Sequence, residues 1–133
     1  MTQTEIIAKM RELGAEHMAL RLSYWDLMMQ KGMYSALDDI AVSRHAVSAA
    51  LTQLCTDLEA AGPFTPSPED KSIYDAAVKW QNAKYDFQKA MTRARKTCTV
   101  ISKTPSWLLD AIRNQSAASA AFMAAIYPQT VAP

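Results

Sequence analysis

The chain has 133 residues, half of them apolar, and a formal net charge of +1. This length fits one domain with a sizeable core, and so small a net charge argues against a dedicated polyanion-binding protein. Only 3 glycines occur, whereas Ala, Leu and Met are plentiful, and no run alternates apolar and polar residues between turn residues. The composition therefore favours helices and predicts no strands.

The two cysteines, Cys55 and Cys98, fall at apolar positions of expected helices, so we expect buried thiols and no disulfide framework. The N-terminus has no secretory signal pattern, and no run reaches the roughly 18 apolar residues of a membrane span. We therefore expect a cytoplasmic protein without a membrane segment.

A first helix is predicted for residues 3–31. Thr2, followed three residues later by Glu5, forms a capping box, in which each side chain accepts from a backbone N–H of the first turn. Apolar residues then recur at spacings of three and four, with His17 as the polar interruption. Gly14 lies in the middle of this helix and predicts that another helix approaches closely there.

A second helix is predicted for residues 35–61, with Ser35 as its N-cap and Arg44 interrupting its apolar face. Gly32 is the expected end of the first helix, and Gly62 the expected end of the second. A connection this short predicts that the first two helices are antiparallel neighbours.

A third helix is predicted for residues 68–102, with Ser67 as its N-cap. A fourth is predicted for 105–126, followed by a flexible tail over 128–133. Residues 116–125 are mostly Ala and Ser, so the fourth helix can pack closely inside a bundle or across a dimer.

Four amphipathic helices with mostly short links predict an all-α fold, a four-helix up-down-up-down bundle. We expect residues 1–127 to form a single domain. The last helix is the one that we expect to be displaced from the bundle or used in dimerisation.

The segment 41–51 resembles the recognition helix of a helix-turn-helix DNA-binding protein, because two Val-Ser pairs, the first at Val42, are followed by Leu51. The resemblance implies that four side chains face the major groove: Ser43, Arg44, His45 and Ser48. It departs from the family pattern because no turn precedes Val42, and because nearby acidic residues disfavour phosphate contact. Chance recurrence of these residues in an amphipathic helix is the alternative.

Seven basic residues lie between Lys79 and Lys103 against a single acid, Asp86, which gives this span a net charge of +6. Its densest part carries four of them: Lys89, Arg93, Arg95 and Lys96. Such a stripe suits phosphates or an acidic protein surface, and the alternative is a solvated helix face. No aromatic residue is interleaved with the final cluster, so stacking of single-stranded bases is not supported.

Two further groups of residues suggest binding. The cationic residues His17, Arg44 and Lys84 interrupt three apolar faces at a similar expected height, which suggests a pocket for a small anion, unless each extends to water. Flexible methionines gather with aromatic residues near the first turn, in the set Trp25, Met28, Met29, Met33 and Tyr34, and Trp107 is a second aromatic anchor. This set suits partner docking, with ordinary core filling as the alternative.

No catalytic constellation, metal-ligand spacing or phosphate-binding loop is present in the sequence, so we expect no cofactor. The function predicted is a non-enzymatic protein–protein interaction module, a cytosolic adaptor or inhibitor with a protein partner. The alternatives are a nucleic-acid-binding regulator that uses the basic face or the helix-turn-helix-like stretch, and a bundle with a small-anion pocket. Homo-oligomerisation is compatible with each of these.

Overall fold

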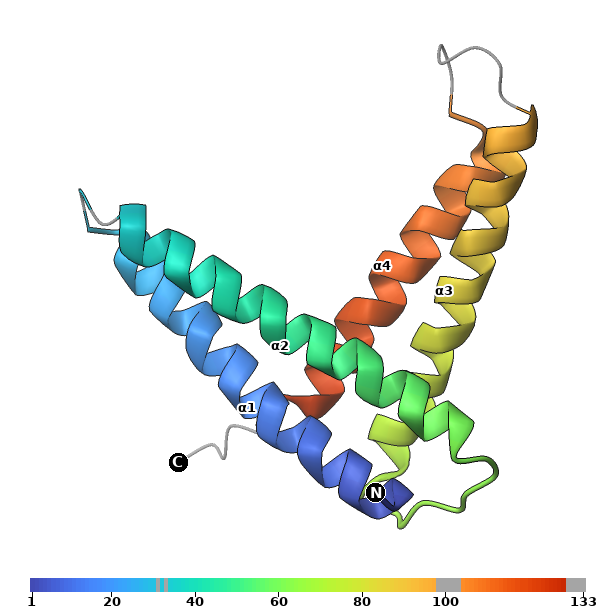
Figure 1. Ribbon diagram of the computed structural model, residues 1–133, viewed down its shortest axis with the longest axis horizontal. Coiled ribbons are helices and arrows are strands. Elements are labelled where there is room, and N and C mark those ends of the chain that lie inside the picture. The colour runs from blue at the N-terminus through green and yellow to red at the C-terminus, as the bar shows by residue number, and fades with distance from the viewer. Residues whose placement is uncertain (31, 33, 98–103, 129–133) are drawn as a thin grey trace. The chain divides into compact units, whose positions relative to one another are not determined.

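The computed structural model describes residues 1–30, 32, 34–97 and 104–128. These residues form four α-helices and no strand, which confirms the all-α prediction (Figure 1). The helices are α1 (Gln3–Met28), α2 (Tyr34–Ala60), α3 (Lys71–Thr97) and α4 (Ser106–Ile126).

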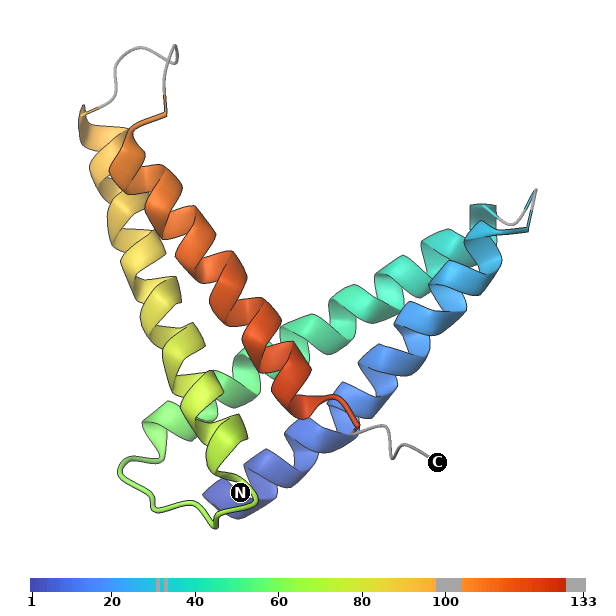
Figure 2. The same ribbon diagram turned by 180° about the vertical axis from the view of Figure 1, so that it is seen from behind.

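The chain divides into two compact units. Unit 1 comprises Met1–Pro66 together with Ile126–Pro133, and unit 2 comprises Ser67–Ala125. Unit 1 holds the antiparallel pair α1 and α2, and unit 2 holds the antiparallel pair α3 and α4, as two opposite views show (Figures 1 and 2). Packing between neighbouring helices is therefore the basis of the fold.

The start of α1 is the one that the sequence predicts. The Glu5 N–H donates to the Thr2 side-chain oxygen at 3.2 Å, so the cap supplies an acceptor that the first helical turn lacks. The helix ends at Met28, three residues before the expected end, where the Gln30 N–H donates to the Leu27 carbonyl at 3.0 Å. Gly32 then takes the left-handed conformation expected of it, with φ of +84°.

The end of α2 also follows its sequence signals, whereas α3 begins later than expected. Gly62 has φ of +88°, and its N–H donates to the Glu59 carbonyl at 3.2 Å. The expected first turn of the third helix, residues 68–70, is a separate turn. Asp70 occupies the cap position, because its carbonyl accepts the first helical hydrogen bond, from the Tyr74 N–H at 2.9 Å. Aspartate is as good a cap as serine, so sequence signals alone do not choose between them.

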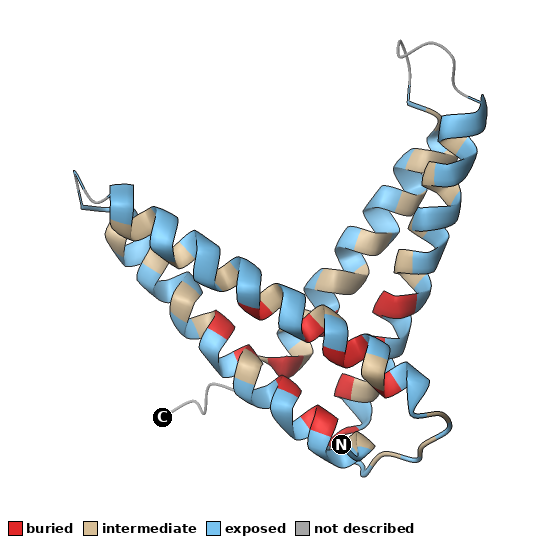
Figure 3. Cartoon of the chain, in the orientation of Figure 1, coloured by how far each residue is buried: buried red, intermediate tan, exposed pale blue. Residues whose placement is uncertain are grey.

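The core of unit 1 occupies only part of its helix pair. The buried residues of α1 lie between Ile6 and His17 and those of α2 between Val47 and Leu58, so the buried colour covers only one part of the pair (Figure 3). The buried apolar residues of these two helices are Ile6, Ile7, Met10, Val47, Leu51, Leu54, Cys55 and Leu58. Burying each large aliphatic side chain stabilises the fold by about 1.5–3 kcal/mol. The expected burial of Cys55 is confirmed, and Cys98 lies outside the described residues.

Residues from the C-terminal end of the chain complete unit 1. A Cβ added at Gly14 would overlap the backbone carbonyl of Ile126, so the close approach predicted at this glycine is present. One turn further along α1, a 2.9 Å hydrogen bond joins His17 Nδ1 to the Tyr127 hydroxyl, and the two rings stack 5.8 Å apart. Ile126 and Tyr127 are therefore held against α1, the first by packing and the second by a polar contact.

Unit 2 is built on aromatic packing between its antiparallel helices. The rings of Trp80 and Phe122 stack with their centroids 5.1 Å apart, and both side chains are buried. Ile73 and Ala77, on the same face of α3 as Trp80, are also buried. Between Asn82 and Thr97 of α3 no described residue is buried. The far end of this hairpin is therefore much more exposed than its Trp80–Phe122 end.

Candidate functional site

The turn end of the α1–α2 pair is incompletely covered. Among the described residues between positions 18 and 46, none is buried (Figure 3). Even the residues that face the neighbouring helix here, such as Leu20, Leu27 and Ile40, are only half-buried. Two helices side by side bury one stripe of each other, and in this half of unit 1 the other apolar side chains remain in contact with water.

The exposed side chains here form a continuous row. Leu22, Trp25 and Met29 are 58%, 56% and 86% exposed. Leu22 and Trp25 share one face of α1, and Met29, four residues further on, is the C-cap residue just after the helix and keeps a helical backbone conformation. We call these three residues the apolar stripe. Sequence reasoning missed Leu22, although the three-four spacing was present in the sequence as a second periodicity beside the one that packs on α2.

The other residues predicted to dock a partner are divided between the two units. Met28 and Tyr34 are exposed at the turn end of unit 1, beside the apolar stripe in the chain. Met33 lies outside the described residues. Trp107 belongs to unit 2, where it is half-buried beneath the guanidinium of Arg93. The structure therefore brings the unit 1 members to one end of a helix pair and gives Trp107 a different environment.

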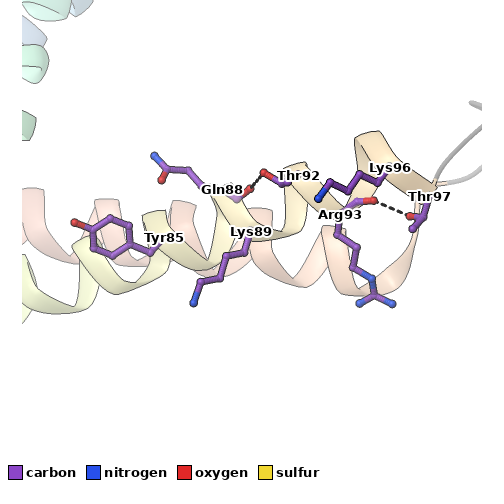
Figure 4. A pocket seen from close by; sticks show the side chains of 7 residues that line it. All are labelled: Tyr85, Gln88, Lys89, Thr92, Arg93, Lys96 and Thr97. Carbon is purple, nitrogen blue, oxygen red and sulfur yellow. Dashed lines mark hydrogen bonds between the residues drawn. The ribbon is translucent and has the colours of Figure 1, made fainter.

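A second candidate surface is a hollow on α3, in unit 2 (Figure 4). It has a volume of about 600 Å³ and is lined by Tyr85, Gln88, Lys89, Thr92, Arg93, Lys96 and Thr97. We call this hollow the basic groove. Three of the four residues of the predicted basic face line it, and Arg95 does not. The helical period explains the difference, because a residue two positions after Arg93 lies nearly on the opposite side of the helix.

The cation at the centre of the basic groove is held by an aromatic ring. The Arg93 guanidinium carbon lies 4.1 Å from the centroid of the Trp107 ring, which is a close cation–π contact. Arg93 and Lys89 also line a second hollow, between α3 and α4, together with the carboxylates of Asp86 and Asp110. The described lining of that hollow has two cations and two acids, whereas the described lining of the basic groove has three cations and no acid.

The three residues of the predicted anion pocket have different surroundings. His17 is buried, and its pKa is lowered by that burial first, and then by the charges of Arg44 and Arg21. Arg44 places its guanidinium 5.6 Å from the Tyr24 ring centroid, and its buried Nε has no hydrogen-bond partner among the described residues. Burial and, to a smaller extent, the positive charge of two nearby arginines therefore disfavour the charged form of His17.

Lys84, the third residue of that set, belongs to unit 2. Its ammonium group donates to the Gln81 side-chain oxygen at 3.0 Å and lies 5.4 Å from the Trp80 ring centroid. These contacts with neighbouring residues of α3 account for a half-buried lysine without a bound anion.

The helix-turn-helix-like segment lies inside one unbroken helix. α2 runs from Tyr34 to Ala60, so no turn precedes Val42. Val47 and Leu51 are buried in the core of unit 1, whereas Ser43 and His45 are exposed. Packing thus explains Val47 and Leu51 of this segment, whereas Val42 is exposed.

Within the described part of the chain, no group of three or more His, Cys, Asp or Glu side chains is arranged to hold a metal ion. None of the helices described has the length and apolar character that crossing a membrane requires. Comparison with protein-family models, with curated proteins and with solved structures found no match to this chain.

Proposed function

We propose that the chain is a non-enzymatic helical module that acts in the cytoplasm by docking a protein partner, as an adaptor or an inhibitor. The observation that supports the proposal is the apolar stripe. Leu22, Trp25 and Met29 are each more than half exposed, in a part of unit 1 where no described residue between positions 18 and 46 is buried.

The geometry of the stripe suits a helical partner. Three anchors at i, i+3 and i+7 are the spacing by which one amphipathic helix recognises another. The stripe spans seven residues, which is about 10 Å or two helical turns. Trp25 supplies a large rigid side chain of the kind that dominates binding energy at interfaces, and Met29 supplies an adaptable one.

Polar residues flank the stripe on the same helix. Arg21 and Asp26 are exposed, carry opposite charges, and border Leu22 and Trp25 in the chain. A polar rim around an apolar centre is the usual anatomy of a protein interface. The partner that we propose therefore presents apolar side chains to the stripe and polar groups of both signs around them.

Affinity capture with purified variants tests this proposal. A double variant, Leu22→Gln with Trp25→Gln, removes the centre of the stripe. Val42→Gln is the matched control, because Val42 is 71% exposed on α2 and lies outside the stripe. We expect the native chain and the control to retain the same partner and the double variant to lose it. Retention of one identical set of proteins by all three would contradict the proposal.

We also propose an arrangement for the whole chain. The two antiparallel pairs form an up-down-up-down bundle, and the Ala- and Ser-rich face of α4 packs inside it or against a second copy. Sedimentation equilibrium tests the second part, because Ala120→Glu on the exposed side of α4 would dissociate a dimer formed through this face. A mass independent of this substitution would contradict dimerisation by α4.

A further inference from the structure

We propose that the basic groove of α3 is a sequence-independent binding site for the phosphodiester backbone of nucleic acid. This site is separate from the apolar stripe and does not depend on the docking function. It goes beyond the basic stripe seen in the sequence, because the structure adds a hollow lined by three of the cations and a contact between Arg93 and Trp107.

The described lining of the groove is positively charged. It contains Lys89, Arg93 and Lys96 and no carboxylate, whereas Asp86 and Asp110 line the second hollow, which Lys89 and Arg93 also border. None of these three cations is in an ion pair with another described residue. Unit 2 as a whole contains nine basic and five acidic residues, so the surrounding field is also positive. A polyanion would therefore replace solvent around cations that have no carboxylate partner in the described part of the chain.

The spacing of the three cations along α3 also suits a strand of phosphates. The three cations lie four and then three residues apart, so they follow one face of α3 for about 10 Å. A nucleic acid strand carries one phosphate per about 3.4 Å along its helix axis, so the groove matches about three successive phosphates. A regular row of charges is suited to a regular polyanion in a way that a single sulfate-sized anion is not.

The shape of the groove also suits an extended ligand. All seven described lining residues come from α3, so no second described helix covers the hollow (Figure 4). Its two threonine hydroxyls donate to the helix backbone, from Thr92 to the Gln88 carbonyl at 2.9 Å and from Thr97 to the Arg93 carbonyl at 2.8 Å. The cations are thus the main groups that can contact a ligand, and cations favour the phosphate backbone of nucleic acid over the edges of its bases.

One of the three cations is partly preorganised. The Arg93 guanidinium packs on the ring of Trp107, a residue of the second hollow beside the groove, and this contact restricts a long side chain before any ligand arrives. Arginine presents a planar set of donors that matches phosphate oxygens, and fixing it reduces the entropy lost on binding. Tyr85 lines the groove one turn before Lys89 and offers an aromatic surface beside the backbone path.

The experiment uses the full chain and fluorescence anisotropy. The probes are an oligothymidylate of about 20 nucleotides and a mixed-sequence duplex of about 20 base pairs, each at about 50 mM and about 200 mM salt. The test variant is Lys89→Gln with Lys96→Gln. The control is Arg95→Gln with Arg113→Gln, which removes the same charge from exposed positions that line neither hollow.

We expect binding that weakens with salt, with a slope of log K against log salt of about −2 for the single strand, as three phosphate contacts predict. The groove variant should bind at least about tenfold more weakly at low salt and should lose more than half of that slope. The control should stay within about twofold of the native chain. Preference for one probe would identify a single strand or a duplex as the ligand.

Three results would overturn the proposal. One is the absence of binding to both probes at low salt. Another is an equal loss in the groove and control variants, which would make the interaction a general effect of charge. The third is displacement of the probe by polyglutamate at the same concentration of charge, which would point to an acidic protein surface. The Leu22 and Trp25 variant should lose its protein partner and still bind the nucleic acid probes. Failure of the docking proposal can therefore be distinguished from failure of the nucleic acid proposal.

Discussion

Gly14 is the residue at which local preference and tertiary packing oppose each other most clearly. Alanine is preferred to glycine inside a helix by about 1 kcal/mol. A Cβ at this position, however, would overlap the carbonyl of Ile126, a backbone atom that cannot turn aside. The sequence indicated a close approach at Gly14 but not the approaching residue, because a contact across more than a hundred positions leaves no local signal.

We predict that Gly14→Ala lowers the free energy of unfolding by about 1–3 kcal/mol, the usual cost of overpacking. Urea denaturation monitored by circular dichroism measures it. An increase in stability, which helix propensity alone would give, would contradict the packing of Ile126 against α1.

The pKa of His17 makes unit 1 sensitive to acid. Its folded-state pKa lies below the ordinary value of 6.5, chiefly because of burial and then because of Arg44 and Arg21. The unfolded chain therefore binds more protons below that value, and its free energy falls relative to that of the folded chain. The stabilising contribution is fully present above the unfolded pKa and is lost as the pH falls from about 6.5 towards the lowered pKa of the folded state.

We predict that the melting temperature falls between about pH 7.5 and about pH 5, and that His17→Gln makes this fall smaller. Thermal unfolding at both pH values measures the effect. His45→Gln is the matched control, because His45 is exposed on α2, and it should leave the fall unchanged. An equal reduction by both substitutions would rule out the buried imidazole as the cause.

At the scale of the elements, each helix pair has its buried residues at one end, and the described residues of the other end are exposed or half-buried. The sequence predicted four helices because caps and glycines mark their ends, as at Thr2 and Gly62. It did not predict which apolar face of α1 is covered. Ile6 to Leu27 and Leu22 to Met29 show the same three-four spacing, and periodicity does not say where a neighbouring helix lies.

We predict that stripe residues contribute little to stability and that core residues of the same unit contribute much. Leu22→Gln should change the free energy of unfolding by less than about 0.5 kcal/mol, as exposed substitutions do. Leu51→Ala, at a position that is 0% exposed, should cost about 2–5 kcal/mol. Denaturant titration of both variants measures the two free energies of unfolding. Comparable decreases would mean that the stripe belongs to the core.

In unit 2 we predict that the stack of Trp80 on Phe122 contributes much more to stability than partly exposed side chains do. Phe122→Ala should cost about 3–5 kcal/mol, because it removes a fully buried ring and its contact with Trp80. Leu109→Ala, at a partly exposed position on the same helix, should cost much less. Equal losses for the two variants, measured by urea denaturation, would be inconsistent with the Trp80–Phe122 stack as the centre of this unit.

At the scale of the whole molecule, the two candidate surfaces differ in chemistry. The apolar stripe lies in unit 1 and the basic groove in unit 2, the unit with the excess of positive charge. The sequence indicated both kinds of surface, the first from Trp25 and Met29 and the second from Lys89 to Lys96. Helical periodicity alone places Arg95 on another side of α3 from Arg93, but it could not add Leu22 to the stripe, because that depends on which side of a helix stays uncovered.

Site-specific photocrosslinking tests the central claim, that the apolar stripe docks a partner, most directly. A photoreactive aromatic amino acid replaces Leu22 in one variant and Val42 in another, since both positions are exposed and only the first lies in the stripe. The account predicts a discrete crosslinked protein with the probe at position 22 and none at position 42, under the conditions in which the chain is normally expressed. Identical products at both positions, or none at position 22, would contradict it.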